Sequence, residues 1–351
     1  MDSHWFGWDI GGAHLKVAMV RTDGRVEQVC QLPCPLWRGL GELDVAFRTL
    51  RLPVQQPGSR HAVTMTGELC DSFDNRAQGV RAIADALGGY LGATSTVRFF
   101  GGPGRWFVRE AMNVDAATEA VASANWLATS AACATVLQDA GVLIDIGSTT
   151  TDLVPFAAGK LLNNALTDGD RLAAEELIYT GVVRTPVMAV CSRASYAGRR
   201  VMLAAELFAT MADVYRLTGE LDEACDLYPA ADGGEKTRAG SARRLLRMVG
   251  RDCAVPADLD AATTLARDLS RMQLRQIEDG LALLLSRGNA CTPIMVVAAG
   301  AGRFLAPELA RRFGLECIDI SVLFGVKDEL RAAAAVSAPA VAVAQLAAQQ
   351  L

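Results

Sequence analysis

Residues 141–152 read Gly-Val-Leu-Ile-Asp-Ile-Gly-Ser-Thr-Thr-Thr-Asp, and the rest of the chain can be interpreted around them. The apolar, mostly β-branched residues at the start predict a short strand that is buried on both faces. This strand ends at Asp145 and Gly147, and Gly147 permits a tight turn with positive φ. Backbone N–H groups at such a turn form an anion site, and Asp145 is placed to hold a metal-bound water beside it. The residues expected to form this anion site are Gly147, Ser148, Thr149 and Thr150. The alternative interpretation is an ordinary hairpin that binds no ligand.

The same pattern occurs near the start of the chain, where residues 6–16 read Phe-Gly-Trp-Asp-Ile-Gly-Gly-Ala-His-Leu-Lys. Asp9 and Gly11 correspond to Asp145 and Gly147, and a second apolar strand follows the turn in both copies. This internal repeat predicts two similar domains that face a cleft, with Asp9 and Asp145 on opposite sides of it. For Lys16 a plain surface lysine is the alternative, and for His14 a residue that simply caps the turn. The phosphate-binding residues expected in this copy are Gly11, Gly12, His14 and Lys16.

Two further polar residues are candidates for substrate binding. Residues 62–65 predict a strand, and Glu68 follows its C-terminal end, where residues of an open α/β sheet line the binding crevice. A turn carboxylate near a helix N-terminus is the alternative for Glu68. Arg184 offers a planar fork of donors that suits carboxylate or phosphate, and a surface ion pair is its alternative.

Residues 196–217 predict one long and largely buried helix, because apolar residues recur along them at helical spacing. Glu206, Thr210 and Asp213 stand at i, i+4 and i+7, so they would form one stripe on this helix. Carboxylates on an apolar helix need partners, because unpaired buried charge is costly. We therefore predict that the stripe faces the active site, with Asp213 or Glu206 as the base; a solvent-facing stripe is the alternative. A single helix is also predicted over residues 115–137, a long helix or a pair of helices over 259–286, and a strand over 187–190.

Composition bounds the class of protein. With 351 residues, 51% of them hydrophobic, the chain is long enough for two domains with real cores. A net charge of −5 argues against nucleic acid binding, and three histidines exclude a His-rich metal site. The apolar stretch near residue 340 contains Pro339 and is shorter than a membrane span, so we expect no membrane partner. Nine cysteines without a CxxC pair, and no recognisable secretory signal, predict reduced thiols in a cytoplasmic protein.

The two Asp-x-Gly hairpins together resemble the paired phosphate loops of the actin-like ATPase and sugar kinase superfamily. Residues 294–302, Ile-Met-Val-Val-Ala-Ala-Gly-Ala-Gly, are similar to the element that touches the nucleoside in that superfamily, which implies binding roles for Gly300 and Gly302. The wider chain resembles the hydantoinase A/oxoprolinase-like proteins of methanofuran biosynthesis, also labelled tetrahydromethanopterin-linked C1 transfer proteins. The segments that carry this resemblance are 9–16, 64–69, 123–126, 179–181, 184–186 and 206–215.

The resemblance implies a two-domain α/β fold of the actin-like ATPase and sugar kinase type, in which two ribonuclease H-like domains enclose a central cleft. We place the first domain at residues 1–122 and the second at 123–329, with a helical insertion at 195–290. A terminal helix within residues 330–351 is expected to pack back on the first domain.

The resemblance also implies an enzyme of methanofuran or methylofuran biosynthesis. Such proteins are thought to join an aminomethyl-furanylmethyl diphosphate to the phenol of γ-glutamyltyramine and to release diphosphate, so the chain would be a transferase with small-molecule substrates. A tyrosine analogue as the acceptor stays open, as does homo-oligomerisation. Mg²⁺ held by Asp9 and Asp145 would chelate the diphosphate, and ATP would not be consumed.

Two other classes of function stay open at this point. One is an ATP-dependent small-molecule kinase of the sugar kinase type, and the other is an actin-like nucleotide-binding scaffold. Ala13 and His14 stand where such kinases commonly carry a hydroxyl residue after the glycines, which counts against the kinase.

Overall fold

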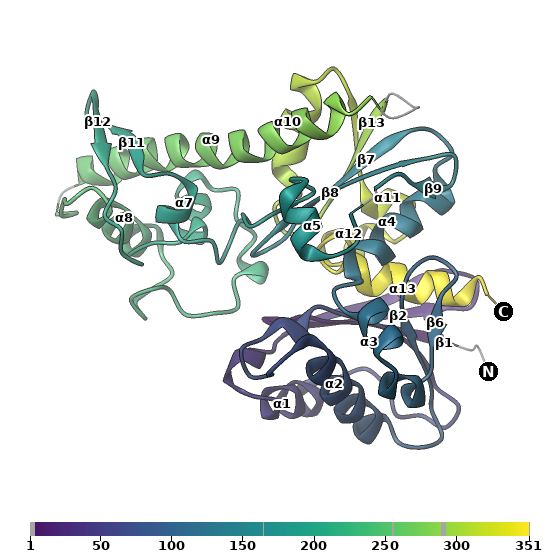
Figure 1. The fold of residues 1–351 in the computed structure, drawn as a ribbon. Coiled ribbons are helices and arrows are strands. Elements are labelled where there is room, and N and C mark those ends of the chain that lie inside the picture. The colour runs from purple at the N-terminus through teal and green to yellow at the C-terminus, as the bar shows by residue number, and fades with distance from the viewer. Residues whose placement is uncertain (1–3, 164, 255, 289–292, 351) are drawn as a thin grey trace. The chain divides into compact units, whose positions relative to one another are not determined.

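The computed structural model describes residues 4–163, 165–254, 256–288 and 293–350. This part of the chain divides into two compact units, which are described separately (Figure 1). Within the described ranges, unit 1 covers residues 4–140, 154–163 and 318–350, and unit 2 covers 141–153 and 165–317. This division into compact units does not test the domain limits expected at residues 122 and 329, which stay a prediction.

Unit 1 is built on a six-stranded sheet with the order β3-β2-β1-β4-β5-β6. β1 and β2 form the hairpin that the sequence predicted, and their antiparallel register sets Asp9 opposite Lys16. On its other side β1 pairs in parallel with β4, so that Asp9 lies opposite Thr64. The strands are β1 (His4–Ile10), β2 (His14–Arg21), β3 (Val26–Pro33), β4 (Arg60–Met65), β5 (Thr96–Phe100) and β6 (Trp106–Phe107).

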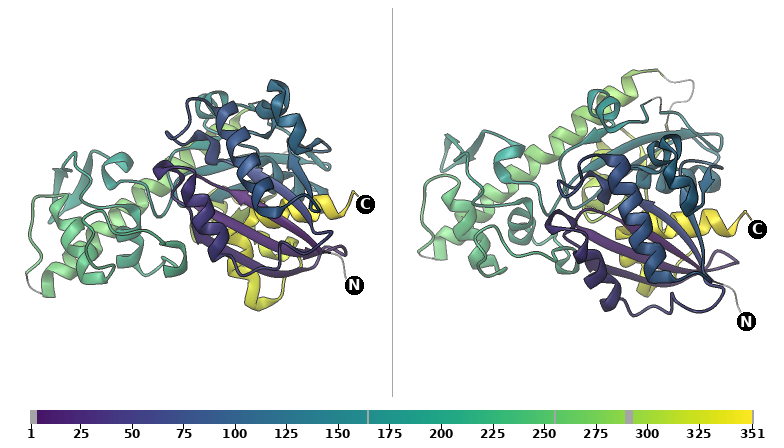
Figure 2. Two further views of the ribbon diagram at one scale, coloured as in Figure 1. Left: turned by 90° about the horizontal axis from the view of Figure 1, so that it is seen from below. Right: turned by 60° about the horizontal axis from the view of Figure 1, so that its bottom comes forward.

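Helices cover both faces of this sheet. Trp8 and Ile10 of β1 pack in a core with Phe47 and Ile83, which lie on α1 and α2. Gly7 points the other way, toward the alanine-rich α13, which also contacts β2, β4 and α4. Both views in Figure 2 show α13 beside the first strands. The helices are α1 (Gly41–Thr49), α2 (Arg76–Leu91), α3 (Asp115–Val121), α4 (Asn125–Val136), α11 (Ile320–Leu323), α12 (Arg331–Val336) and α13 (Ala338–Ala348).

The single helix predicted over residues 115–137 is wrong, because the chain breaks between α3 and α4. Ser123 lies in the break with a φ of 52°, in the left-handed region that non-glycine residues rarely adopt. Its hydroxyl donates to the Glu68 carboxylate at 2.8 Å. The interaction with Glu68 therefore accompanies an unusual backbone conformation at the start of α4.

The second sheet repeats the strand order of the first, as β10-β8-β7-β13-β14, with β9 paired to β8. β7 and β13 are parallel, with Asp145 opposite Ala299, and β10 is antiparallel to β8. β8 and β14 run across the division between the units. The strands are β7 (Gly141–Ile146), β8 (Thr151–Ala157), β9 (Lys160–Leu161), β10 (Leu177–Ile178), β13 (Met295–Ala299) and β14 (Glu316–Asp319).

The long helix predicted over residues 196–217 is also wrong. The chain forms the β11–β12 hairpin, continues without regular structure and becomes helical only in α7. The strand predicted at 187–190 is the short helix α6 instead, whereas residues 259–286, predicted as one long helix or a pair, lie in the single helix α9. The elements are α5 (Asp168–Ala173), α6 (Val187–Val190), β11 (Arg193–Tyr196), β12 (Arg199–Met202), α7 (Met211–Thr218), α8 (Arg238–Arg247), α9 (Pro256–Ser286) and α10 (Ala306–Arg312).

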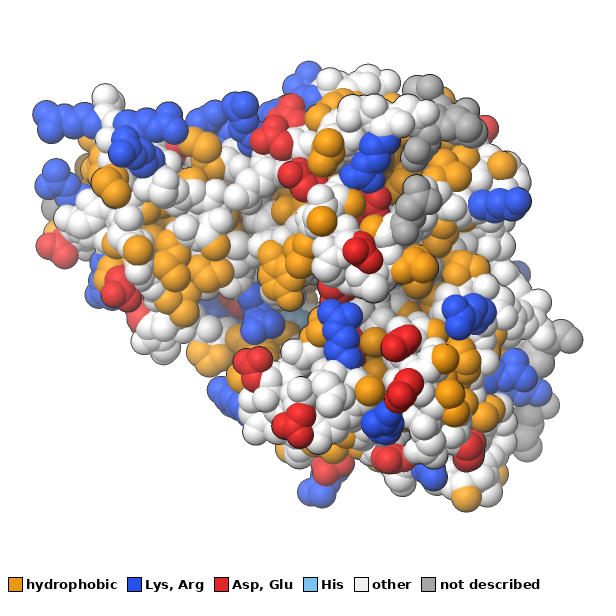
Figure 3. Space-filling model, in the orientation of Figure 1, with side chains coloured by type: hydrophobic (Ala, Val, Ile, Leu, Met, Phe, Trp, Pro, Cys, Tyr) orange, Lys and Arg blue, Asp and Glu red, His pale blue; other side chains and the backbone are white. Residues whose placement is uncertain are grey.

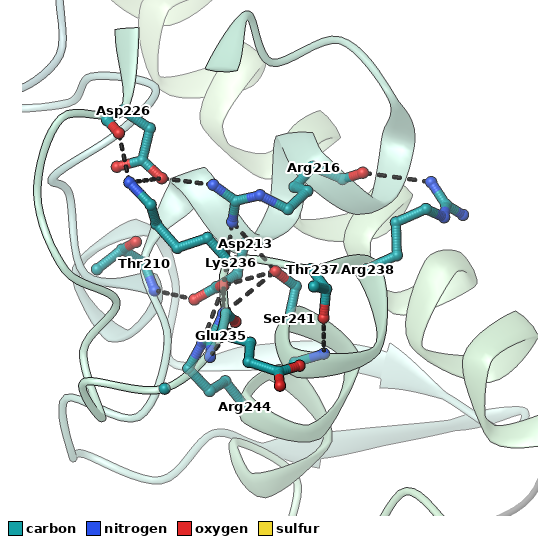
Figure 4. A network of polar contacts seen from close by, with 12 residues as sticks. Thr210, Asp213, Arg216, Asp226, Glu235, Lys236, Thr237, Arg238, Ser241 and Arg244 are labelled. Atoms are coloured by element: carbon teal, nitrogen blue, oxygen red, sulfur yellow. Dashed lines mark hydrogen bonds and ion pairs between the residues drawn. The ribbon is translucent and has the colours of Figure 1, made fainter. Parts of the chain in front are cut away.

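A buried ion-pair network holds α7 against α8 (Figure 4). Arg244 is 1% exposed and donates to Asp213 through Nε at 3.0 Å and through Nη2 at 2.7 Å. Asp213 also accepts from the Ser241 hydroxyl at 2.8 Å and lies 3.6 Å from Arg216. In addition, Asp213 forms a capping box with Thr210 at the start of α7. By contrast, exposed arginines cover the β11–β12 hairpin and the outer face of α9 (Figure 3).

Within the described residues, no single helix is long and apolar enough to cross a membrane. The stretches Asp328–Val336 and Ala338–Ala348 meet that criterion only as a pair, and they are bent by 102° relative to each other.

Replacing Gly7 by alanine should destabilise the protein. An ideal Cβ on Gly7 would lie 1.9 Å from the backbone oxygen of Ala340, so β1 and α13 would have to separate. We expect a loss of about 1–3 kcal/mol in the free energy of unfolding, measured by urea denaturation. Gly89→Ala is the matched control: Gly89 is exposed on α2 with nothing within 4 Å of its Cβ position, and the change should stabilise by about 0.5–1 kcal/mol. Equal effects would contradict the close packing of α13 on β1.

Replacing Arg244 by leucine should leave the Asp213 carboxylate buried without its main partner. A buried charge that loses its partner typically costs about 3–5 kcal/mol of stability, and denaturant titration would measure this. Arg247 lies on the same helix, is half exposed and contacts Asp232 at 3.7 Å. Arg247→Leu should therefore change stability by less than about 1 kcal/mol. A small loss in the Arg244 variant would show that the network contributes little to the fold.

Candidate active site

Turn 1, residues 11–14, joins β1 to β2 in unit 1. The Gly11 N–H donates to the His14 carbonyl at 2.9 Å and closes the turn. The carbonyls of Gly12 and Ala13 accept from the N–H groups of Leu36 at 3.0 Å and Cys34 at 2.9 Å. The turn is thus held from one side by the chain that follows β3. His14 is buried at the start of β2.

Three polar side chains lie side by side across the strands that lead to turn 1. Asp9 is 3% exposed, and its Oδ2 lies 3.5 Å from Lys16 Nζ on β2. Thr64 faces Asp9 from β4. Asp9 Oδ1 and Thr64 Oγ1 are both buried, and neither has a hydrogen-bond partner among the described residues. Burial raises the pKa of Asp9, and the Lys16 ammonium opposes that shift. Sequence reasoning missed Thr64, although strand alternation and the pairing with β1 could have placed it there.

Glu68 also lies beside turn 1. It follows Gly67, whose ideal Cβ would be 3.1 Å from the Ile10 carbonyl oxygen. Glu68 is 1% exposed; one carboxylate oxygen accepts from Ser123, and the other has no partner among the described residues. Burial raises the pKa of Glu68, and the bond from Ser123 partly opposes this. A buried carboxyl with one uncommitted oxygen is suited to binding a polar ligand or exchanging a proton.

Turn 2, residues 147–150, joins β7 to β8 and is closed in the same way. The Gly147 N–H donates to the Thr150 carbonyl at 2.8 Å. Residues 180–185, which we call the strap, lie against this turn. The Gly147 carbonyl accepts from Val182 at 3.1 Å, and the Ser148 carbonyl accepts from Val183 at 3.1 Å and Arg184 at 2.8 Å. The Thr149 carbonyl accepts from the Thr185 hydroxyl at 3.4 Å.

These contacts determine which way the turn presents its donors. In a trans peptide the C=O of one residue and the N–H of the next point in opposite directions. Because the carbonyls of residues 147–149 bond to the strap, the N–H groups of Ser148, Thr149 and Thr150 point away from it. Their residues are half-buried, and consecutive N–H groups of this kind form an anion-binding concavity. The anion-binding role predicted for turn 2 stays a prediction, and these N–H groups are the donors on which it depends.

The strap needs a glycine, and its neighbour Arg184 is placed by the same contacts. An ideal Cβ on Gly181 would lie 2.4 Å from the Thr149 nitrogen, so no side chain fits between strap and turn. The Gly181 N–H donates to the Thr185 hydroxyl at 2.8 Å. Arg184 is half-buried, and its own N–H bonds to turn 2.

Gly300 and Gly302 follow β13 and lie against the end of β7. Gly300 has a φ of +84°, and its ideal Cβ would be 2.4 Å from Asp145 Oδ1. The Gly302 N–H donates to the Ile146 carbonyl at 2.7 Å. The backbone at Gly300 therefore lies so close to Asp145 that a side chain at position 300 would displace the Asp145 carboxylate.

The two predicted bases do not share a helix face. Glu206 is exposed in the irregular stretch before α7, and Asp213 is buried in the network with Arg244. The stripe that suggested them is absent, so their catalytic role stays a prediction without that support. Asp9 belongs to unit 1 and Asp145 to unit 2, and their meeting across a cleft likewise stays a prediction.

Comparison with solved structures supports the fold. The chain is 15% identical to a ROK family glucokinase from Streptomyces griseus solved with glucose and AMPPNP, with a TM-score of 0.50 over 98% of this chain and 99% of that one. The predicted fold class, that of actin-like ATPases and sugar kinases, is thereby confirmed. At this identity the likeness concerns the fold alone.

Comparison with curated sequences gives two relatives that carry the same name. Both are called "(4-{4-[2-(gamma-L-glutamylamino)ethyl]phenoxymethyl}furan-2-yl)methanamine synthase". The protein from Methanocaldococcus jannaschii is 28% identical over 98% of both chains. The one from Methanococcus vannielii is 32% identical over 32% of this chain and 50% of that one. The sequence model of the hydantoinase/oxoprolinase family matches residues 60–350, and this chain belongs to that family.

Proposed function

We propose that this protein is a transferase of methanofuran or methylofuran biosynthesis. It would join an aminomethyl-furanylmethyl diphosphate to the phenol of γ-glutamyltyramine, or of a tyrosine analogue, and release diphosphate. The observation that carries the proposal is the full-length similarity to the Methanocaldococcus jannaschii synthase. The name of that synthase contains a phenoxymethyl-furan unit, which is an aryl ether, and this is the bond that the proposed reaction forms.

The proposed step is a displacement at the furan CH₂ group. The phenol oxygen forms the new C–O bond while the bond to the diphosphate oxygen breaks, and the electron pair leaves with diphosphate. The phenol proton passes to a carboxylate. Charge grows on the leaving diphosphate, so N–H donors aimed at it in advance lower the barrier. The N–H groups of turn 2 suit this task. Turn 1, which belongs to unit 1, would bind the same diphosphate.

The residues present are compatible with Mg²⁺. Asp9 Oδ1 is buried without a partner among the described residues, and an uncommitted carboxylate oxygen is a ligand that Mg²⁺ accepts. Within those residues no group of three His, Cys, Asp or Glu could hold a metal. Mg²⁺ commonly binds through one or two carboxylates together with substrate phosphates, which needs no such group. Asp9 and Asp145 would hold the ion, which would neutralise diphosphate charge.

The remaining roles are proposed residue by residue. Glu68 and Arg184 would bind the substrates, with Gly300 and Gly302 shaping the site around Asp145. Asp213 and Glu206 stay the proposed proton acceptors. Since Asp213 already accepts from Arg244 and Ser241, Glu68 enters as a further candidate for the proton.

Purified protein should form the aryl ether from a furanylmethyl diphosphate and γ-glutamyltyramine without ATP. One diphosphate should appear per ether formed, because diphosphate is the leaving group. Mass spectrometry of the product and an enzymatic diphosphate assay would measure this. Conversion of ATP to ADP with a phosphorylated product would overturn the proposal in favour of a kinase.

Asp145→Asn should weaken the binding of Mg²⁺-diphosphate, because it removes the charge that orders the metal shell. At about 100 times its Kd, diphosphate should add roughly 2.7 kcal/mol to the stability of the wild type. We expect the variant to raise the Kd about tenfold, which corresponds to about 1.4 kcal/mol, in isothermal titration calorimetry. Asp139→Asn is the matched control, since Asp139 is an exposed carboxylate nearby in the sequence. Equal affinity in all three proteins would exclude Asp145 from the metal site.

A further inference from the structure

Gln273 is a buried polar residue in the middle of the long helix α9. Its side chain has no exposed surface and makes three hydrogen bonds. Oε1 accepts from the Tyr215 hydroxyl at 2.6 Å, and Nε2 donates to the Thr180 hydroxyl at 2.8 Å and to the Gly181 carbonyl at 2.9 Å. Both amide hydrogens and the amide oxygen are therefore engaged.

Packing alone does not explain a glutamine here. The neighbouring core positions of α9, Leu269 and Ile277, are apolar and fully buried, and an apolar residue would fill the same space. Burying an amide costs free energy unless each of its groups is bonded. Burial raises the pKa of Tyr215, which keeps its hydroxyl protonated and able to donate to Gln273. The hydrogen-bond partners therefore account for a glutamine at position 273, whereas the available volume would also admit an apolar residue.

Two of those partners, Thr180 and Gly181, belong to the strap that holds turn 2. Gly181 lies directly against the peptide between Ser148 and Thr149. The Thr180 carbonyl accepts from the Thr151 hydroxyl at 2.7 Å, which fixes the strap to the start of β8. A continuous path of hydrogen bonds and close contacts thus runs from Tyr215 on α7 through Gln273 to the peptides of turn 2.

We propose that Gln273 is a positioning residue for the anion site of turn 2. Together with Tyr215 it holds the strap, the strap holds the carbonyls of residues 147–149, and the N–H groups of Ser148, Thr149 and Thr150 stay aimed at the anion. If the strap shifted, these peptides could rotate and turn their carbonyl oxygens toward the diphosphate. The identity of that anion rests on the proposed function, but the positioning of the turn does not.

The test compares Gln273→Leu with Gln276→Leu. Gln276 lies on the same helix and donates to the Val190 carbonyl at 2.9 Å, but it does not bond to the strap. Loss of the buried donor in Gln273→Leu should raise the Kd of inorganic diphosphate with Mg²⁺ about tenfold or more, and the control should change it less than about twofold. Calorimetric titration measures both, and each melting temperature shows how far stability alone has changed. Equal Kd values in the two variants would overturn the proposal.

Hydrogen exchange tests the same idea without a ligand. The N–H groups of Val182, Val183 and Arg184, which donate to the carbonyls of turn 2, should exchange faster in Gln273→Leu than in the wild type or in Gln276→Leu. If the wild type binds no diphosphate, the proposed function fails, and the exchange rates still decide whether Gln273 holds the turn. If Gln273→Leu does not fold, Tyr215→Phe removes a single hydroxyl from the path and should show the same change to a smaller degree. Unchanged exchange in that variant would then overturn the proposal.

Discussion

A turn can offer its N–H groups to an anion only if its carbonyl oxygens are bonded elsewhere, and turn 2 depends on this constraint. Four consecutive carbonyls, from Gly147 to Thr150, are occupied by the strap or by the turn itself. The need for close contact explains the glycine at 181, and the need for a fixed strap explains the buried amide of Gln273. A polar interior in this part of unit 2 is therefore what the proposed anion site would require.

The same constraint governs turn 1, but different parts of the chain meet it. Cys34 and Leu36 supply the N–H groups there, and the Thr66 N–H donates to the Ile10 carbonyl much as the Gly302 N–H donates to that of Ile146. Both sheets keep one strand order around these turns. The repeat seen in the sequence is therefore a repeat of architecture, whereas the groups that support each turn have diverged.

The sequence predicted the parts of the fold that local pattern determines. Both Asp-x-Gly hairpins, the strand before Gly300 and the helix α9 combine strong periodicity with turn residues at their ends. The prediction of a helix over residues 196–217 failed because apolar residues recur there at helical spacing. The chain instead forms the β11–β12 hairpin, and Gly198 lies at its tip. The partner of Asp213 is Arg244, 31 residues away, and Gln273 lies 92 residues from Gly181. Contacts over such separations leave no local signal, so neither the network nor the path to turn 2 could be predicted.

The packing of α13 on β1 has a consequence for how the chain is made. One face of β1 is covered by α13, residues 338–348, so this face stays uncovered until all the residues between the two elements have been synthesised. At about 5–20 residues per second, synthesis of the intervening chain takes tens of seconds. During this time the face of the unit 1 sheet on which α13 will pack is exposed and can bind chaperones. Unit 2, whose segments leave the ribosome before α13, can complete its core first.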